Sequence, residues 1–275
     1  FTDGVSCVQN NKVMDQIFNY GKNTDVLIIQ FAQDNFLSEN GVVNDGLLAT
    51  KLGLKGIPDI AEQIIIERDL RLLEQYKTKY HIALISSKKS IDLIKSAKEK
   101  GMKFSVGVSI NNLSLNDNDI GDFRTFLKLS PPLRSEEDRL ALIHAVNEGI
   151  IDVIVSDHKP EDEESKRLTF QQATTGASGI ETLLPLALEL VHNNLCDLNT
   201  VIKNLTSNPG KILGIRNGTL SIGGEADITI FDLEKPWVLK KENIQSKSKN
   251  TAIENRKLQG KVEKTFINGR LVFSN

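Results

Sequence analysis

Short apolar runs alternate with longer amphipathic segments over the first two hundred residues. Four of these runs are almost continuously apolar, at 25–30, 80–85, 103–108 and 151–155. Such runs are typical of strands buried on both faces of a parallel sheet. The segments between them place apolar residues at helical spacing, so the alternation predicts right-handed βαβ units and a parallel sheet.

The predicted helices carry terminal signals. Pro58 suits the first position of a helix that extends to about residue 76. Ser135 precedes three acidic residues and predicts another helix start, while Gly101 and Gly149 suit the positions just past helix ends. Two further helices are expected at 179–193 and 197–205.

The pattern changes from about residue 217. The run 227–232 alternates like a strand, and two more apolar runs flank Asn268-Gly269, a strong signal for a type I′ hairpin. We therefore expect a barrel portion at residues 1–215 and a small β-sandwich module at 216–275. Four strands are half of a (β/α)8 TIM barrel or a small open sheet, and the absence of a nucleotide-type glycine fingerprint favours the α/β barrel.

Composition narrows the class of protein. The 275 residues carry a formal net charge of −2, which argues against a dedicated nucleic-acid binder. No stretch approaches the roughly 18 apolar residues of a membrane span. Two cysteines cannot form a disulfide framework, which predicts a reducing, cytoplasmic setting. The start at Phe1-Thr2-Asp3-Gly4 resembles no signal peptide, and we expect this chain to be the latter part of a longer one.

A series of short motifs follows in order along nearly the whole chain. It comprises GLKGIP (53–58), SPPLR (130–134), SDHKP (156–160), GIETLLP (179–185), TSNP (206–209), GEAD (224–227) and SKSKNT (246–251). Together they resemble dihydroorotase, of the amidohydrolase superfamily. The resemblance implies a metal-dependent barrel hydrolase of pyrimidine biosynthesis, with its site at the carboxyl ends of the strands. It also implies reversible cyclisation of N-carbamoyl-aspartate to dihydroorotate, with zinc as cofactor and Asp157 as the proton-carrying catalytic residue.

The resemblance fails at the positions where the family binds zinc. The histidine that ends one strand is replaced by Phe31, or by Gln30 if the register slips by one. The second histidine of the next strand is Leu84, while His81 matches the non-ligand histidine. Since zinc needs nitrogen, sulfur or carboxylate donors, these positions predict a degenerate metal centre.

Two further family motifs are also altered. The acidic motif near the start reads Phe-Thr-Asp-Gly, with Asp3 as its single acid, and a His-His pair is replaced by Asn111-Asn112. The family's His-x-His pair lies outside this chain. We therefore expect no metal ligand among the residues present, and no zinc or weakly bound zinc.

The substrate-binding positions differ as well. Ser130 replaces the asparagine before the Pro-Pro pair, and Glu161 replaces the histidine four residues after Asp157. A carboxylate at that position would repel a dicarboxylate substrate at close range. Ser130 and Glu161 are nevertheless the candidate substrate-binding residues of this chain.

The remaining histidines and cysteines favour structural roles. We expect His81 in the core and His158 as a packed or hydrogen-bonded neighbour of Asp157. His144 and His192 lie on predicted helices, and Cys7 and Cys196 match no family position, so none of the four predicts chemistry.

The resulting hypothesis is a dihydroorotase-like protein that is non-catalytic. It would act as a homo-oligomer and a partner of aspartate carbamoyltransferase or of an active dihydroorotase, with no nucleic-acid or membrane partner. Two alternatives remain open. One is an active dihydroorotase or related cyclic amidohydrolase with a reduced metal site and Asp157 as its base; the other is a module that binds a pyrimidine precursor without converting it.

Overall fold

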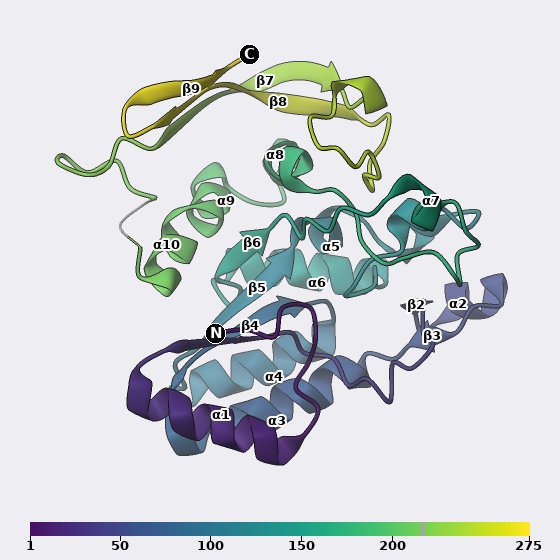
Figure 1. Ribbon diagram of the computed structural model, residues 1–275, viewed down its shortest axis with the longest axis vertical. Coiled ribbons are helices and arrows are strands. Elements are labelled where there is room, and N and C mark those ends of the chain that lie inside the picture. The colour runs from purple at the N-terminus through teal and green to yellow at the C-terminus, as the bar shows by residue number, and fades with distance from the viewer. Residues whose placement is uncertain (216–217) are drawn as a thin grey trace.

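The computed structural model describes residues 1–215 and 218–275, and its central element is a four-stranded parallel sheet (Figure 1). The strand order is β1-β4-β5-β6, and every neighbouring pair is parallel. The strands are β1 (Leu27–Gln30), β4 (Lys79–Ile85), β5 (Ser105–Ser109) and β6 (Val153–Val155). They confirm the four apolar runs predicted as strands of a parallel sheet.

Helices follow the strands as the amphipathic pattern predicted. The helix predicted from Pro58 begins at Ile60. The Ser135 hydroxyl accepts a hydrogen bond from the Asp138 N–H and so caps the helix predicted to start there. Gly101 has a φ of +82°, as expected just past a helix end. The predicted helices are α3 (Ile60–Tyr76), α4 (Lys88–Glu99), α6 (Glu136–Asn147), α8 (Leu183–His192) and α9 (Leu198–Leu205).

Several elements were not predicted. The most substantial is α1 (Asn11–Thr24), which buries Met14 and Phe18 and packs beside α3 (Figure 1). The segment after β1 contains β2 (Val43–Asn44), which pairs with β3 (Gly56–Ile57), and α2 (Leu47–Leu52) lies between these two strands in the chain. Short helical turns fill the other connections: α5 (Ile110–Ser114), η1 (Asp117–Ile120), η2 (Thr125–Leu127), α7 (Glu163–Lys166), η3 (Ile180–Thr182), α10 (Ser207–Leu213) and η4 (Lys241–Asn243).

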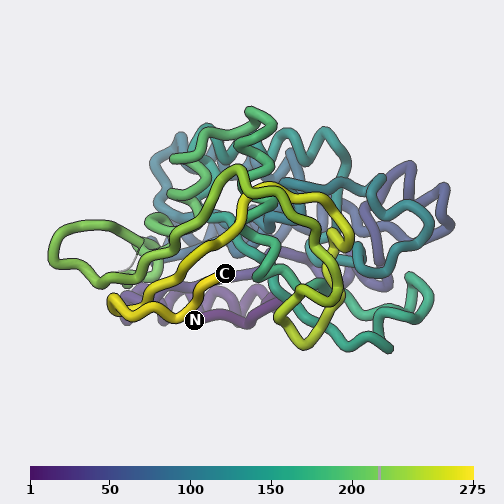
Figure 2. Tube along the Cα trace, turned by 90° about the horizontal axis from the view of Figure 1, so that it is seen from above, coloured from purple at the N-terminus to yellow at the C-terminus, as the bar shows by residue number. Residues whose placement is uncertain are grey.

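The predicted β module is a three-stranded antiparallel sheet, which lies at the top of the molecule in Figure 1 and crosses the face nearest the viewer in Figure 2. Its strands are β7 (Ile228–Val238), β8 (Lys257–Ile267) and β9 (Arg270–Ser274). Asn268 and Gly269 have φ angles of +49° and +75°, which confirms the predicted type I′ hairpin. The predicted boundary between residues 215 and 216 lies next to residues 216–217, which are outside the described residues.

The module packs on the barrel portion through α8. At Gly260 of β8, a Cβ would lie 2.3 Å from Leu188 Cδ1, so only glycine permits this close approach of strand and helix. Trp237 Nε1 donates a hydrogen bond to the Gly260 carbonyl at 2.9 Å. The sheet, its helices and the inner edge of the module therefore share one hydrophobic core. Within the described residues, no helix is both long and apolar enough to cross a membrane.

Candidate functional site at the strand ends

The carboxyl ends of the parallel strands lie at one edge of the sheet, where α/β proteins place their ligand sites. Ser86 follows β4, Asn111 follows β5, and Asp157 follows β6. All three are buried or half-buried. The predicted active-site residue Asp157 therefore lies at the edge of the sheet where a ligand site is expected.

Asp157 lies in an unusual environment. Its backbone has a φ of +48°, a left-handed conformation that non-glycine residues rarely adopt. Burial raises the pKa of the carboxyl from 3.8 to about 7, although a hydrogen bond with Ser109 and the charge of Lys159 act in the opposite direction. The carboxyl is therefore poised to exchange a proton near neutral pH.

His158 has the structural role that was expected. Its Nδ1 accepts a hydrogen bond from the Gly179 N–H at 3.1 Å, and its backbone bridges to Ala177. These contacts join the two ends of the segment Asp157–Gly179, which we call the strand-end loop. The imidazole thus closes the base of the loop.

A buried lysine stabilises the interior of the strand-end loop. Lys166 is 2% exposed, and its Nζ donates hydrogen bonds to the carbonyls of Thr174 (2.8 Å) and Gly176 (2.9 Å). Burial lowers its pKa to about 8, with the Glu161 carboxylate opposing this effect. Glu161 therefore lies within electrostatic range of Lys166 in the same loop.

The positions where the family binds zinc do not supply ligands. Phe31 is 5% exposed at the end of β1, and Leu84 is half-buried near the end of β4. The Gln30 amide contacts the sulfur atoms of Cys7 and Met14, at 3.5 and 3.8 Å. Within residues 1–215 and 218–275, no group of three or more His, Cys, Asp or Glu side chains could hold a metal ion. Phe31 and Leu84 offer no donor atom to the zinc ion that the resemblance implies at these two positions.

The two asparagines that replace the family's His-His pair are buried. The Asn112 amide donates to the Pro132 carbonyl at 2.9 Å, which ties α5 to the segment containing Ser130. Ser130 itself is half-buried and precedes Pro131 through a cis peptide bond. Among the described residues, Asn111 Nδ2 and Asn112 Oδ1 have no hydrogen-bond partner.

His81 is a core residue, as expected. Its Nδ1 lies 2.8 Å from Ser105 Oγ on the neighbouring strand, and burial lowers its pKa to about 4. A Cβ at Gly107 would lie 3.2 Å from His81 Nε2, so the ring packs against the strand backbone. A neutral histidine in this setting supports the sheet.

Sequence reasoning missed a buried charged network beside β4. Arg134 of the SPPLR motif donates to Ser86 Oγ (3.1 Å) and to the Ile57 carbonyl (2.6 Å). The Ser86 backbone N–H donates to both carboxylate oxygens of Glu62, and its hydroxyl to one of them. An arginine after a Pro-Pro pair was visible in the sequence, but its side-chain hydrogen-bond partners lie 48 to 90 residues away.

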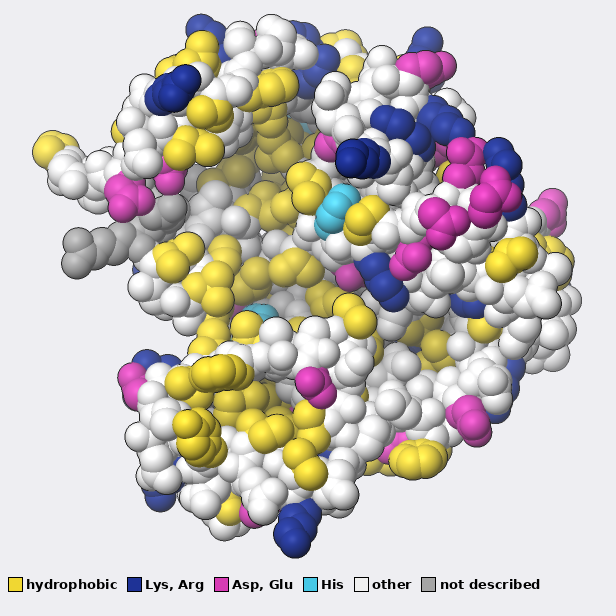
Figure 3. Space-filling model, viewed as in Figure 1, with side chains coloured by type: hydrophobic (Ala, Val, Ile, Leu, Met, Phe, Trp, Pro, Cys, Tyr) yellow, Lys and Arg dark blue, Asp and Glu magenta, His cyan; other side chains and the backbone are white. Residues whose placement is uncertain are grey.

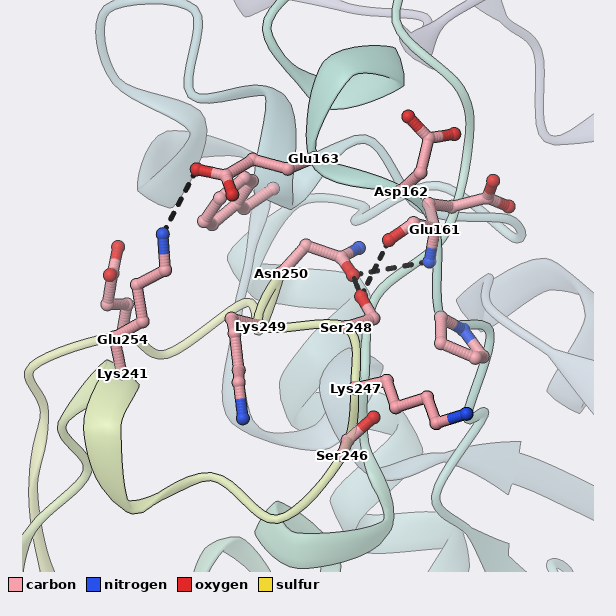
Figure 4. Close-up of a pocket in the computed structure, with 12 residues that line it drawn as sticks. Glu161, Asp162, Glu163, Lys241, Ser246, Lys247, Ser248, Lys249, Asn250 and Glu254 are labelled. Carbon is pink, nitrogen blue, oxygen red and sulfur yellow. Dashed lines mark hydrogen bonds and ion pairs between the residues drawn. The ribbon is translucent and has the colours of Figure 1, made fainter.

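A cavity of about 630 Å³ is lined by part of the strand-end loop and by a segment of the β module (Figure 4). We call residues 241–250 the module loop. Lysine and acidic side chains both line the cavity, in the region where Figure 3 shows both charge types gathered near α7. The cavity is lined by Phe126, Pro160, Glu161, Asp162, Glu163, Lys241, Ser246, Lys247, Ser248, Lys249, Asn250 and Glu254.

The parallel sheet, the strand-end aspartate and the order of the motifs define the class of protein. Residues 57–272 match the amidohydrolase family, and the chain belongs to that family. Residues 1–90 also match the dihydro-orotase-like family.

Curated relatives sharpen this assignment. The chain is 40% identical to the dihydroorotase of Anaplasma phagocytophilum over 274 residues, or 99% of this chain and 61% of the relative. It is 39% identical to the dihydroorotase of Ehrlichia canis, over 100% of this chain and 62% of the relative. The resemblance to dihydroorotase is thus confirmed, and the chain spans about three fifths of the length of these relatives.

Solved structures confirm the barrel fold. L-hydantoinase from Arthrobacter aurescens superimposes with a TM-score of 0.88 at 22% identity, covering 99% of this chain and 62% of that chain. Dihydropyrimidinase from Brevibacillus agri superimposes with a TM-score of 0.86 at 21% identity, covering 97% and 60%. The four parallel strands therefore correspond to part of a (β/α)8 barrel.

Proposed function

We propose that this chain is a dihydroorotase-like component of pyrimidine biosynthesis that does not itself catalyse the zinc-dependent reaction. The observation that carries the proposal is the apolar character of the metal positions. Phe31 is almost fully buried where the family has a histidine, and Leu84 takes the place of a second one. Hydrocarbon side chains cannot replace the hydration shell of a divalent ion, so these positions disfavour metal binding.

The altered substrate positions support the same proposal. Glu161 places a carboxylate where the family has a histidine, and Ser130 is shorter than the asparagine it replaces. N-carbamoyl-aspartate carries two carboxylates, so a third one nearby would weaken its binding. Ser130 and Glu161 are therefore proposed as substrate positions that have lost their original function.

The intact fold suggests a role in an assembly. We propose that the protein acts in the cytoplasm as a homo-oligomer, and that it binds aspartate carbamoyltransferase or an active dihydroorotase. The support is that the buried network of Glu62, Ser86 and Arg134 is complete although the metal positions are not. Such a pattern is expected when the shape of the barrel is needed but its chemistry is not.

The test is to measure zinc content and dihydroorotate turnover on the purified protein, alone and mixed with each proposed partner. We expect substoichiometric zinc, no turnover by the protein alone, and a stable complex in size-exclusion chromatography. Stoichiometric zinc together with turnover by the isolated protein would contradict the proposal. Absence of a complex, with no zinc and no turnover, would contradict the proposed partner but not the proposed non-catalytic role.

The environment of Asp157 favours a second candidate, an active cyclic amidohydrolase with a reduced metal site. A carboxyl whose pKa is about 7 can act as a general base near neutral pH. In this case Asp157→Asn would abolish turnover of dihydroorotate or a related cyclic amide. Turnover that survives this substitution would exclude Asp157 as the base.

A further inference from the structure

The strand-end loop has two arms that leave and return to the sheet edge side by side. The Lys159 N–H donates to the Ala177 carbonyl at 2.9 Å, and Gly179 bonds to His158 as described above. These contacts join the arms at the base, and the bonds from Lys166 Nζ to the Gly176 carbonyl and from the Thr174 N–H to the Ser165 carbonyl join them farther along. Farther out, Glu161 on one arm and Gly176 on the other both meet the module loop.

Asn250 of the module loop binds both arms at once. Its Oδ1 accepts a hydrogen bond from the Glu161 N–H, and its Nδ2 donates to the Gly176 carbonyl, each at 3.2 Å. The backbone carbonyl of Asn250 accepts a hydrogen bond from the Ser178 N–H at 2.8 Å. The residue is 3% exposed, so these polar groups are protected from competing water.

Ser248 adds a second contact to each arm. Its hydroxyl donates to the Glu161 carbonyl at 2.6 Å, and its carbonyl accepts from the Ser178 hydroxyl at 3.3 Å. Figure 4 shows the Ser248 and Asn250 side chains directed at the backbone of Glu161. A surface ion pair between Lys241 and Glu163, at 3.0 Å, is exposed and contributes little.

The cavity is lined by Pro160–Glu163 of the strand-end loop and by residues 246–250 of the module loop. Beside it, the two loops are joined by the directional hydrogen bonds of Asn250 and Ser248. We propose that Asn250, assisted by Ser248, is a positioning residue that latches the strand-end loop shut and so holds Asp157 in its buried, left-handed conformation.

The chemistry of asparagine suits this latch. An amide presents one acceptor and two donors, and the two arms require an acceptor for an N–H and a donor for a carbonyl. The substitution Asn250→Asp would keep the acceptor but turn a carboxylate toward the Gly176 carbonyl, whereas Asn250→Ala would remove both groups. The asparagine, aspartate and alanine side chains therefore differ in which of the two arms they can bind.

The test is residue-resolved amide hydrogen exchange on the intact protein. In Asn250→Ala we expect the Glu161 and Ser178 amides to exchange roughly ten- to hundredfold faster. The Glu161 N–H loses its side-chain acceptor, and the Ser178 N–H is released when the backbone of residue 250 moves away from the loop. In Asn250→Asp we expect faster exchange at Ser178, while Glu161 stays protected. The matched control is Ser246→Ala, since Ser246 binds Glu181 through its backbone N–H and should leave exchange unchanged.

A second measurement separates a latch from general stabilisation. Carboxyl carbon NMR of Asp157 should show its pKa falling from about 7 toward its ordinary value in Asn250→Ala, because the open loop admits water. If that variant fails to fold, Ser248→Ala should give a smaller acceleration confined to the loop arms. Unchanged exchange at Glu161 and Ser178, or equal acceleration throughout the sheet, would overturn the proposal. None of these results depends on whether the protein turns over dihydroorotate.

Discussion

The guanidinium of Arg134 donates through Nε to Ser86 Oγ at 3.1 Å, which places a buried cation directly behind the end of β4. The Ser86 hydroxyl in turn donates to Glu62 at 2.5 Å. One serine thus links a buried cation to a buried anion. Each charge depends on this arrangement, because an unpaired charge in the core is strongly unfavourable.

Removing Arg134 should therefore destabilise the protein strongly. We expect Arg134→Met to lower the free energy of unfolding by about 3 kcal/mol or more, since Glu62 would stay buried without its compensating cation. The measurement is urea denaturation followed by circular dichroism. The control is Arg71→Ala, whose side chain is 76% exposed and pairs with Glu67, and which should cost less than about 1 kcal/mol. Equal effects of the two substitutions would contradict a special role for the network.

Asp157 should make stability fall as pH rises. Its pKa is 3.8 when unfolded and about 7 when folded, so the folded state retains a proton that the unfolded state loses over this range. The contribution is fully present below pH 3.8 and is lost as pH rises toward 7, by up to about 4 kcal/mol. Asp157→Asn should remove this dependence and gain stability relative to the native protein at about pH 8. Parallel stability curves for the two proteins across this range would refute the prediction.

His81 should act in the opposite direction. Its pKa is lowered from 6.5 to about 4 by burial, so the unfolded state binds a proton that the folded state excludes. Stability should be intact above pH 6.5 and decrease as pH falls toward 4, by up to about 3 kcal/mol. His81→Gln keeps a polar side chain that does not titrate and should flatten this limb of the curve. His144→Gln, at an exposed site, should not change it.

Restoring the missing ligands tests the interpretation of the metal positions. We expect the double variant Phe31→His/Leu84→His to bind zinc more tightly than the native protein, because imidazole nitrogens replace hydrocarbon at two strand ends. Isothermal titration calorimetry with zinc measures the difference. The control Phe31→Ala/Leu84→Ala opens similar space without adding donors and should bind no better than the native protein. An equal affinity in all three proteins would show that these positions do not face a metal site.

The strands of the barrel could be predicted because their signal is local. Each buried strand appears as a short apolar run, and the Asn268-Gly269 pair identified its hairpin because both residues tolerate positive φ. Helix α1 was missed although Met14 and Phe18 lie on one face, four residues apart. Its N-cap residue Asn10 was a signal that could have found it, since the side chain accepts hydrogen bonds from Lys12 and Val13.

The candidate site was predictable only in part. The order of the motifs placed Asp157 at the end of the last strand, and the replacements at Phe31 and Leu84 were read from single positions. The raised pKa of Asp157 could not be predicted from the sequence, because it depends on burial. The loop that contains Asp157 is closed by a contact between His158 and Gly179, which are 21 residues apart. The contact between Glu161 and Asn250, which are 89 residues apart, had no local signal.

The sequence by itself determined the alternation of strands and helices and the family, and it placed Phe31 and Leu84 where the resemblance implies histidines. These features depend on side-chain type and local spacing, which the sequence contains directly. Only the tertiary structure decided that Glu62 and Arg134 share Ser86, and that Asn250 holds both arms of the strand-end loop. Hydrogen bonds between distant segments form wherever the folded backbone brings a donor to an acceptor, and no short-range pattern encodes that meeting.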